Sequence, residues 1–502
     1  MRVIYSEFNS KNAIELVKNL SSKYNWNPVS FLSSGDLDKQ EHKFDEDCEF
    51  ISLDLLRSGI FPKHKNKNPI DKSILEKLSK YESSYFSWFE DTNGWNFSYN
   101  ERREYYHNIL NFWNNYIHKK KPDIIFSYTW PHLIADYPLY LLCTKIYKIK
   151  FLFINPIPFF ENRLSIGNNL ENISETFKED YIKNISNDDF KINKDVNTFF
   201  DQVSSDSPSM SKDVSIYLKH LDNINFYSFL LEFLKLTITL KGFKKCQIFF
   251  KSNHLPLRLD KSRLNNFQYL NFRIKNFNKI NKLKKFYKKK CKTKLPEKYI
   301  LFLGGYQPEV LSNLISGHDE IIKNVIERVS AFLPKDWKIL YKEHPNIFKP
   351  GDKGALWRNE DFYNNLLSID NLQLVDYEMN TYELLDRSEA VATISGSIGI
   401  ESIIRGKPAI VFGQSWYRPC KSIYYINNND DIKNAFYLIN QQNQINAKDV
   451  KIYLQTVFDL SSKELYKLNP NYFISSKNLN QNEIQVLTEV ILRFFNHLYK
   501  EV

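Results

Sequence analysis

The sequence predicts an α/β protein with two domains. The chain has 502 residues, which exceeds the usual size of a single hydrophobic core, and its 42% hydrophobic residues are ample for folding. Apolar runs typical of buried strands alternate with helical stretches, first over residues 123–156 and again over residues 391–412. This alternation is typical of parallel sheets covered by helices.

The N-terminal domain is expected over residues 1–240. Its strands are predicted at the apolar runs 3–5, 29–32, 50–53, 123–128 and 151–156, and its helices at 13–24, 81–119 and 133–146. The loops after the last two strands hold His132 and Glu161, at the edge where a parallel sheet presents residues to a ligand. His132 fits a core or capping role as well as a catalytic one. Glu161, on a proline-rich loop, is the better candidate for the acceptor side.

The middle and the end of the chain have different compositions. Residues 165–225 are rich in Asn, Asp and Ser and predict a surface insertion with short helices. Residues 241–298 are strongly basic, with lysines closely spaced from Lys282 to Lys294. Such a run usually forms a solvated helix or linker; the alternative is contact with anionic lipid, worth on the order of 1 kcal/mol per basic residue. Residues 426–502 have helical patterns that we expect to pack back towards the N-terminal domain.

The C-terminal domain, expected over residues 299–425, contains a loop of small residues between an apolar run and a short helix. The loop includes Ser395, Gly396, Ser397 and Gly399. It leaves room for a phosphate, and the helix that follows directs free N–H groups and its positive end at an anion. Glu401 lies on the first turns of this helix, within reach of a sugar hydroxyl. Taken alone, such a loop also fits an ordinary β–α–β turn without a ligand.

A second polar strand end lies upstream. Residues 337–345 form an apolar strand that ends in Lys342, Glu343 and His344 before Pro345. Because side chains alternate along a strand, Lys342 and His344 project from one side and Glu343 from the other. A lysine and a histidine on one side suit a nucleotide phosphate or a sugar carboxylate.

A third strand, residues 299–305, breaks at two glycines into Tyr306, Gln307, Pro308 and Glu309. Taken singly, Lys342 fits a solvated side chain, His344 a buried histidine, and Glu309 the first-turn carboxylate of a helix. Together, polar groups or glycines at three strand ends of one βα-rich segment predict a functional crevice.

These motifs resemble the bacterial capsule and surface polysaccharide biosynthesis glycosyltransferases. The resemblance is carried, in order and with natural spacing, by residues 306–309, 333–334, 342–345, 395–401, 406–408 and 412–417. That family includes retaining β-Kdo transferases; Kdo is an acidic eight-carbon sugar supplied as a CMP conjugate. The resemblance implies a GT-B architecture, in which two Rossmann-like domains face a cleft. Family members usually have Gly-Thr and Glu-Ala where this chain has Gly396-Ser397 and Glu401-Ser402, both small-for-small changes.

The resemblance and the strand ends together predict a site for a nucleotide-sugar donor, with CMP-Kdo as the expected donor. The nucleotide is expected to contact Lys342, His344, Pro345, Ser395, Gly396, Ser397, Glu401 and Ser402. Gln307 and Lys342 are expected to contact the donor sugar. Glu309 is the predicted catalytic carboxylate, and Glu161 and His132 are further catalytic candidates. The strand ends carry no DxD-like motif, so we expect no required metal or other cofactor.

Composition narrows the partners and the compartment. The formal charge of +11 suits an anionic membrane surface, an anionic glycan or nucleic acid, but no nucleic-acid motif accompanies it. Five cysteines without CxxC spacing argue against a disulfide framework and a zinc site. The first residues predict a strand rather than a signal peptide. We expect a cytoplasmic protein, at most peripheral on the inner face of the cytoplasmic membrane, whose acceptor is a lipid-linked or oligosaccharide chain of capsule or lipopolysaccharide.

Two other readings remain open. A UDP-sugar 2-epimerase or a polyol-phosphate transferase shares the Ser-Gly, Glu and Gly-Lys-Pro pattern, but the Gln307-Pro308-Glu309 element argues against both. The second alternative is a non-catalytic protein of glycan assembly. The predicted convergence of Lys342, His344 and Glu309 argues against it, because such a protein would not need these groups together.

Overall fold

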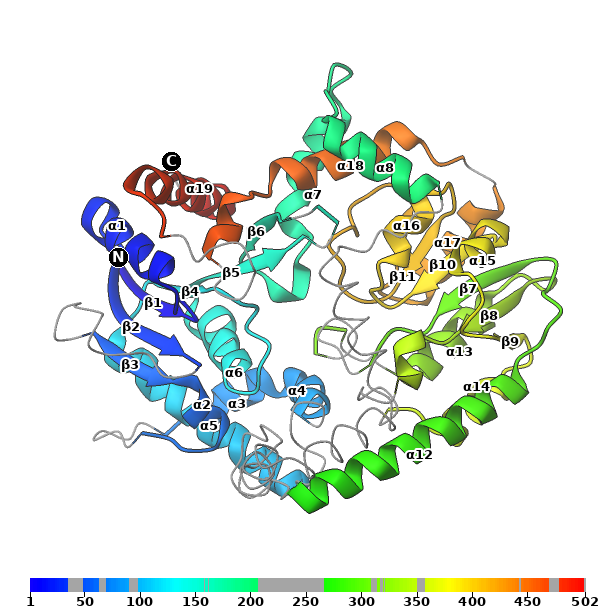
Figure 1. Cartoon of the computed structure of the whole chain (residues 1–502), viewed down its shortest axis with the longest axis horizontal. Coiled ribbons are helices and arrows are strands. Elements are labelled where there is room, and N and C mark those ends of the chain that lie inside the picture. The colour runs from blue at the N-terminus through cyan, green and yellow to red at the C-terminus, as the bar shows by residue number, and fades with distance from the viewer. Residues whose placement is uncertain are drawn as a thin grey trace, which may run out of the picture. The chain divides into compact units, whose positions relative to one another are not determined.

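The computed structural model forms two compact units (Figure 1). It describes residues 1–34, 48–62, 69–89, 98–157, 159–160, 162–205, 266–307, 314–316, 319, 321–349, 357–441, 444–468 and 478–500, with only the backbone for 266–274 and 276. The first unit holds the described residues of Met1–Thr176 and Thr456–Val502. The second holds those of Phe177–Pro256 and Arg263–Gln455. Residues 177–205, predicted as part of the N-terminal domain, therefore belong to the second unit.

The first unit contains a six-stranded sheet in the order β3-β2-β1-β4-β5-β6. Its strands are β1 (Arg2–Ser6), β2 (Asn27–Ser33), β3 (Glu49–Ser52), β4 (Ile124–Ser127), β5 (Lys150–Pro156) and β6 (Leu164–Gly167). Neighbouring strands pair in parallel except β6, which is antiparallel to β5. The central strands are buried along most of their length, as expected for apolar runs covered by helices.

Helices from both ends of the chain cover the first sheet. They are α1 (Lys11–Tyr24), α2 (Leu53–Arg57), α3 (Lys72–Leu78), α4 (Glu82–Phe89), α5 (Tyr99–Lys120), α6 (Asp136–Leu141) and α19 (Gln481–Tyr499). A π-helical turn, Leu142–Tyr147, extends α6. Figure 1 shows α19 beside α1, and the Asn19 amide of α1 donates to the Thr488 hydroxyl of α19 at 2.8 Å. The C-terminal helix thus completes the core of the first unit.

The second unit contains a six-stranded, all-parallel sheet in the order β12-β11-β10-β7-β8-β9. Its strands are β7 (Tyr299–Leu303), β8 (Lys338–Lys342), β9 (Leu372–Val375), β10 (Ala390–Thr393), β11 (Ala409–Val411) and β12 (Ile423–Tyr425). Its helices are α7 (Glu175–Ile185), which starts at the unit boundary, α8 (Lys194–Ser204), α12 (Asn266–Lys290), α13 (Ile322–Phe332), α14 (Glu360–Leu367), α15 (Thr381–Arg387), α16 (Ile398–Ile404), α17 (Asn429–Asn440) and α18 (Ala447–Asp459), which crosses the other boundary.

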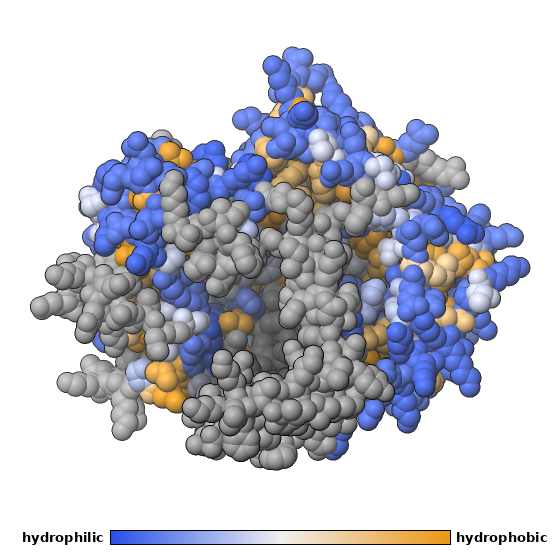
Figure 2. All heavy atoms as spheres, viewed as in Figure 1, coloured by the Kyte–Doolittle hydropathy of each residue, from blue (hydrophilic) through white to orange (hydrophobic). Residues whose placement is uncertain are grey.

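Of the closely spaced lysines from Lys282 to Lys294, those up to Lys290 lie on the last turns of α12. Leu283 and Tyr287 are 2% and 0% exposed and belong to the core of the second unit. The Tyr287 hydroxyl donates to the Val375 carbonyl at 2.8 Å. The end of α12 is therefore part of the second unit rather than a separate linker. In the view of Figure 2, most of the surface of the described residues is hydrophilic, and hydrophobic side chains appear in small groups.

Both sheets have the Rossmann strand order. Numbered along the chain within each unit, the strands follow 3-2-1-4-5-6. This confirms the predicted α/β fold with two Rossmann-like domains; the cleft between them stays a prediction. No helix in the described part of the chain is long and apolar enough to span a membrane. Among the same residues, no group of three or more His, Cys, Asp and Glu side chains is placed to hold a metal ion.

Candidate functional site

The candidate site lies at the carboxyl ends of the strands in the second unit. Chain order reverses between β7 and β10, which pair in parallel, so the loops after these strands leave the sheet on either side of a switch point. Ligands of open α/β sheets bind in the crevice at this point. The loop after β7 starts at Gly304, and the loop after β10 holds Ser395, Gly396 and Ser397. The sheet thus places two of the three predicted strand ends at the switch point.

Lys342 is the last residue of β8 and pairs with Leu303, the last residue of β7. It is 3% exposed, and burial lowers its pKa to about 8 despite the opposing charges of Asp376 and Glu343. Its ammonium makes no hydrogen bond or ion pair with any residue that the structure describes. A buried cation that makes no ion pair is costly, and an anionic ligand would supply one.

His344 lies beyond the end of β8 and is half-buried. Its Nδ1 accepts the Asn346 N–H at 3.2 Å, so in the neutral ring the proton lies on Nε2. Burial lowers the pKa of His344 to about 4, which leaves the ring neutral at neutral pH. The ring centroids of His344 and Tyr306 are 5.7 Å apart. His344 therefore offers a ligand an N–H donor rather than the positive charge that a charge-stabilising role implies. Pro345 is exposed and starts a 3-10 turn, Pro345–Phe348.

The small-residue loop is shaped largely by contacts within the protein. The Gly396 N–H donates to the Thr393 hydroxyl at 3.1 Å, and the Tyr417 hydroxyl donates to the Gly396 carbonyl. A Cβ on Gly399 would lie 2.5 Å from the Tyr417 hydroxyl, so packing alone requires glycine there. Ser395 is half-buried and Ser397 is exposed, and neither hydroxyl bonds to a described residue. The serines, more than the glycines, are the groups that remain for a ligand.

The helix after this loop is short. α16 has seven residues, all buried, so its dipole contributes less than the sequence pattern suggests. The Ser402 hydroxyl donates to the Gly399 carbonyl at 2.8 Å inside the helix, and Glu401 is 7% exposed. Ser402 and Glu401 were predicted to contact the nucleotide. Both side chains lie in a buried helix, so a nucleotide would have to enter that buried region to contact them.

A buried network around Glu343 supports the strand ends, and the sequence analysis missed it. Glu343 is 0% exposed and accepts hydrogen bonds from the hydroxyls of Tyr341 and Tyr363, at 3.0 and 2.9 Å. Arg358 donates its Nε–H to Glu343 at 2.9 Å, and its side chain is 1% exposed. Glu343 also accepts the His344 N–H at 2.9 Å. This network fixes the backbone between Lys342 and His344.

The same network holds the loop after β7. Arg358 donates to the amide oxygen of Gln307 at 3.0 Å, and Gln307 is 2% exposed. A Cβ on Gly304 would lie 2.4 Å from the Tyr341 hydroxyl and 2.6 Å from Glu343 Oε1. Gly304 is therefore required by the network. Gln307, predicted to contact the donor sugar, uses its oxygen to bind Arg358.

The three predicted catalytic candidates are not brought together by the described structure. Glu309 and Glu161 lie outside the described residues. His132 belongs to the first unit, where its Nδ1 bonds to the Trp130 carbonyl at 2.7 Å. Because a carbonyl only accepts, this nitrogen carries the proton.

A family comparison adds an independent finding. Residues 250–420 match the model of a family described as "Capsule polysaccharide biosynthesis protein". The match supports the coarse part of the sequence interpretation, a role in capsule polysaccharide biosynthesis. Kdo as the transferred sugar and CMP as its carrier stay predictions. Among curated proteins, none matches this chain.

Solved structures with distant similarity belong to two classes of enzyme. UDP-GlcNAc 2-epimerase from Methanocaldococcus jannaschii has 13% identity and a TM-score of 0.26, covering 91% of this chain and 100% of that chain. The KpsC beta Kdo 2,7 transferase of Thermosulfurimonas dismutans has 12% identity and a TM-score of 0.26, covering 69% and 88%. The KpsC beta Kdo 2,4 transferase has 14% identity and a TM-score of 0.25, covering 36% and 55%. At these TM-scores the similarities favour neither class.

Proposed function

We propose that this protein is a glycosyltransferase of surface polysaccharide biosynthesis. It transfers Kdo or a related acidic sugar from a CMP-activated donor to a capsule or lipopolysaccharide acceptor. The observation that carries the proposal is Lys342, a buried cation that makes no ion pair with a described residue, beside the switch point of a Rossmann-like sheet. The family match over residues 250–420 supplies the biosynthetic context.

The strand-end groups suit the needs of glycosyl transfer from a nucleotide. The leaving nucleotide gains negative charge as the glycosidic bond breaks, and fixed donors near that charge lower the barrier. Lys342 would provide the charge, His344 an N–H donor, and Ser395 and Ser397 hydroxyl donors. Glu309 remains the proposed catalytic carboxylate, and no metal is proposed.

A thermal-shift panel of CMP, CDP, UDP and GDP tests the nucleotide. CMP should raise the melting temperature most, and Ser397→Trp should remove that rise by filling the loop with a large side chain. The largest rise with UDP would instead favour the 2-epimerase reading. If no nucleotide stabilises the protein, or the Ser397→Trp variant responds to CMP as the wild type does, the proposed site is wrong. Mass spectrometry of products from CMP-Kdo then tests the transfer itself.

A further inference from the structure

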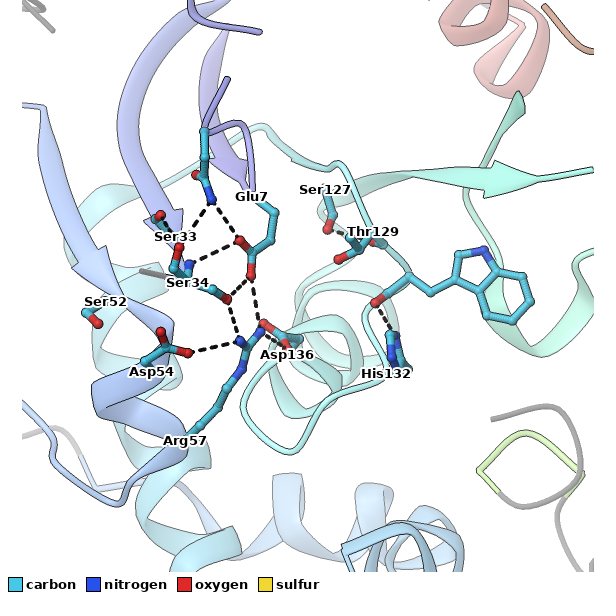
Figure 3. A network of polar contacts seen from close by, with 12 residues as sticks. Glu7, Ser33, Ser34, Ser52, Asp54, Arg57, Ser127, Thr129, His132 and Asp136 are labelled. Carbon is cyan, nitrogen blue, oxygen red and sulfur yellow. Dashed lines mark hydrogen bonds and ion pairs between the residues drawn. The ribbon is translucent and has the colours of Figure 1, made fainter. Parts of the chain in front are cut away.

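The first unit has its own polar edge at the carboxyl ends of its strands. Four neighbouring parallel strands, β3, β2, β1 and β4, end in Ser52, Ser33, Ser6 and Ser127. Chain order reverses between β1 and β4, so this edge contains the switch point of the first sheet. Figure 3 shows Ser33, Ser52 and Ser127 around a network of charged side chains.

The network is centred on Arg57, the last residue of α2, whose side chain is 4% exposed. Its guanidinium donates to Asp136 Oδ2 at 2.8 Å, to Glu7 Oε1 at 3.3 Å and to the Ser34 hydroxyl at 2.5 Å. Glu7 in turn accepts the Ser34 N–H at 3.0 Å. Residues that follow four different strands therefore meet at one point (Figure 3).

This network is incomplete in two respects. One guanidinium faces the carboxylates of Glu7 and Asp136, which are 14% and 13% exposed, so the cluster carries excess negative charge. Arg57 also keeps a buried Nε–H that has no acceptor in the described chain. Buried polar groups are normally satisfied, so an unmet donor beside two partly exposed carboxylates marks a binding edge more than a structural ion pair.

The unmet groups define the chemistry of a ligand. Excess negative charge repels a phosphate or a carboxylate. An ammonium group could pair with the carboxylates but has no lone pair to accept the Arg57 Nε–H. A hydroxyl group does both, because it donates one hydrogen bond and accepts others.

We propose that this edge binds a neutral, hydroxyl-rich sugar. Glu7 and Asp136 accept hydrogen bonds from its hydroxyls, and Arg57 is a positioning residue that holds both carboxylates. Identifying this sugar as part of the acceptor glycan rests on the proposed glycosyltransferase function. The binding chemistry itself rests only on the first unit.

Saturation-transfer NMR on the full chain tests this proposal. The probes are the methyl glycosides of β-galactose, β-ribofuranose and N-acetyl-β-glucosamine, with the negatively charged methyl glycoside of Kdo as the contrast. At least one neutral glycoside should bind at millimolar concentration, more tightly than the charged one. The double variant Glu7→Gln/Asp136→Asn should weaken that binding about tenfold or more, since each hydrogen bond to a charged acceptor is lost. Glu15→Gln, at a carboxylate of α1 that is 46% exposed, is the matched control and should change nothing.

The CMP thermal shift, recorded on the same samples, separates this proposal from the proposed function. If CMP does not stabilise the wild type but a neutral sugar binds, the proposed glycosyltransferase function is wrong and the sugar site is supported. Absence of neutral-sugar binding to the wild type, or unchanged binding to the double variant, would overturn the sugar site alone. If the double variant does not fold, Asp136→Asn by itself should still weaken binding several-fold, and unchanged binding would again overturn the proposal.

Discussion

In the first unit, the strands around the switch point end in serine, and the charged groups beyond them are carboxylates around Arg57. In the second unit the strand order is the same, but β8 ends in Lys342, a buried cation. The shared topology therefore gives both units the edge at which open α/β sheets bind ligands, and we expect the residues at the strand ends to decide the charge of the ligand. A nucleotide suits the second edge, and a neutral sugar suits the first.

The buried Arg57 and Arg358 side chains show the same difference. Arg358 and Glu343 have side chains that are 1% and 0% exposed, and the tyrosines around them complete the hydrogen bonds. One positive and one negative charge balance, so this network supports the structure. Arg57 faces more negative charge than it carries and keeps one unmet N–H. A network whose charges balance holds neighbouring site residues in place. A network with excess charge can itself bind a ligand.

Arg358→Met should have the largest effect and tests this distinction. It leaves the Glu343 carboxylate buried without its cation, which should lower the free energy of unfolding by about 3–5 kcal/mol. Arg57→Met should cost less, because Glu7 and Asp136 are 14% and 13% exposed and water can solvate them. Urea unfolding of the full chain, with and without CMP to mark the second unit, measures both losses. Equal losses would contradict the division into balanced and unbalanced networks.

The fold could be predicted from the sequence because its strands are local apolar runs. One strand end was predicted a residue too far: residue 53 was predicted to end a strand, but Leu53 starts α2, with Ser52 accepting the Leu55 N–H as its cap. Ser and a following apolar run are a known helix-start signal. The site was less predictable. Arg358 lies in a loop segment where an arginine is usually solvated, and only the fold brings it to Glu343.

The polar edge of the first unit shows a second limit. The sequence alone does not show that the four strand-end serines are neighbours, because the strand order brings them together. Lys342 was identified correctly as a strand-end cation because its strand is apolar up to that residue. Whether it forms an ion pair with a described residue depends on the packing around it, which one sequence does not give.

Lys342→Met should stabilise the second unit and weaken nucleotide binding. Burial lowers the pKa of Lys342 from 10.5 to about 8, which corresponds to about 3 kcal/mol of destabilisation while the side chain is charged. The unfolded chain binds more protons between these values, so wild-type stability should rise with pH from about 8 to 10.5, and the variant's advantage should shrink. Unfolding curves at pH 7 and pH 10 check this. A variant that is less stable than the wild type at pH 7 would show that Lys342 has a structural partner.

Contact with anionic membrane should depend on lysines that form no ion pair with a described residue. Lys285 and Lys289 of α12 are exposed, whereas Lys284 and Lys288 lie 3.8 and 2.5 Å from Glu378. Lys285→Gln/Lys289→Gln should weaken binding to phosphatidylserine vesicles by on the order of 1 kcal/mol per lysine. Lys284→Gln/Lys288→Gln is the matched control and should weaken it less. Co-sedimentation at low and high salt measures both, since screening weakens exposed contacts. Equal binding to neutral and anionic vesicles would rule out this surface.

The affinity for CMP at the second edge should depend on pH. Below about pH 8, Lys342 is charged in the free protein, so a bound CMP phosphate finds its counter-ion already in place. Above that pH the free lysine is neutral, because burial lowers its pKa to about 8, whereas a bound phosphate would raise that pKa again. Binding must then take up a proton, and the affinity for CMP should fall about tenfold for each pH unit above 8. Below pH 8 the affinity for CMP should stay constant down to about pH 6, where the phosphate itself starts to protonate.

Isothermal titration calorimetry in buffers of different ionisation enthalpy measures both the affinity and the proton uptake. The Lys342→Met protein should bind weakly at every pH and take up no proton. A wild-type affinity that is constant from pH 7 to pH 10 would show that Lys342 does not contact the nucleotide phosphate, and the contrast between the two edges would then rest on the first unit alone.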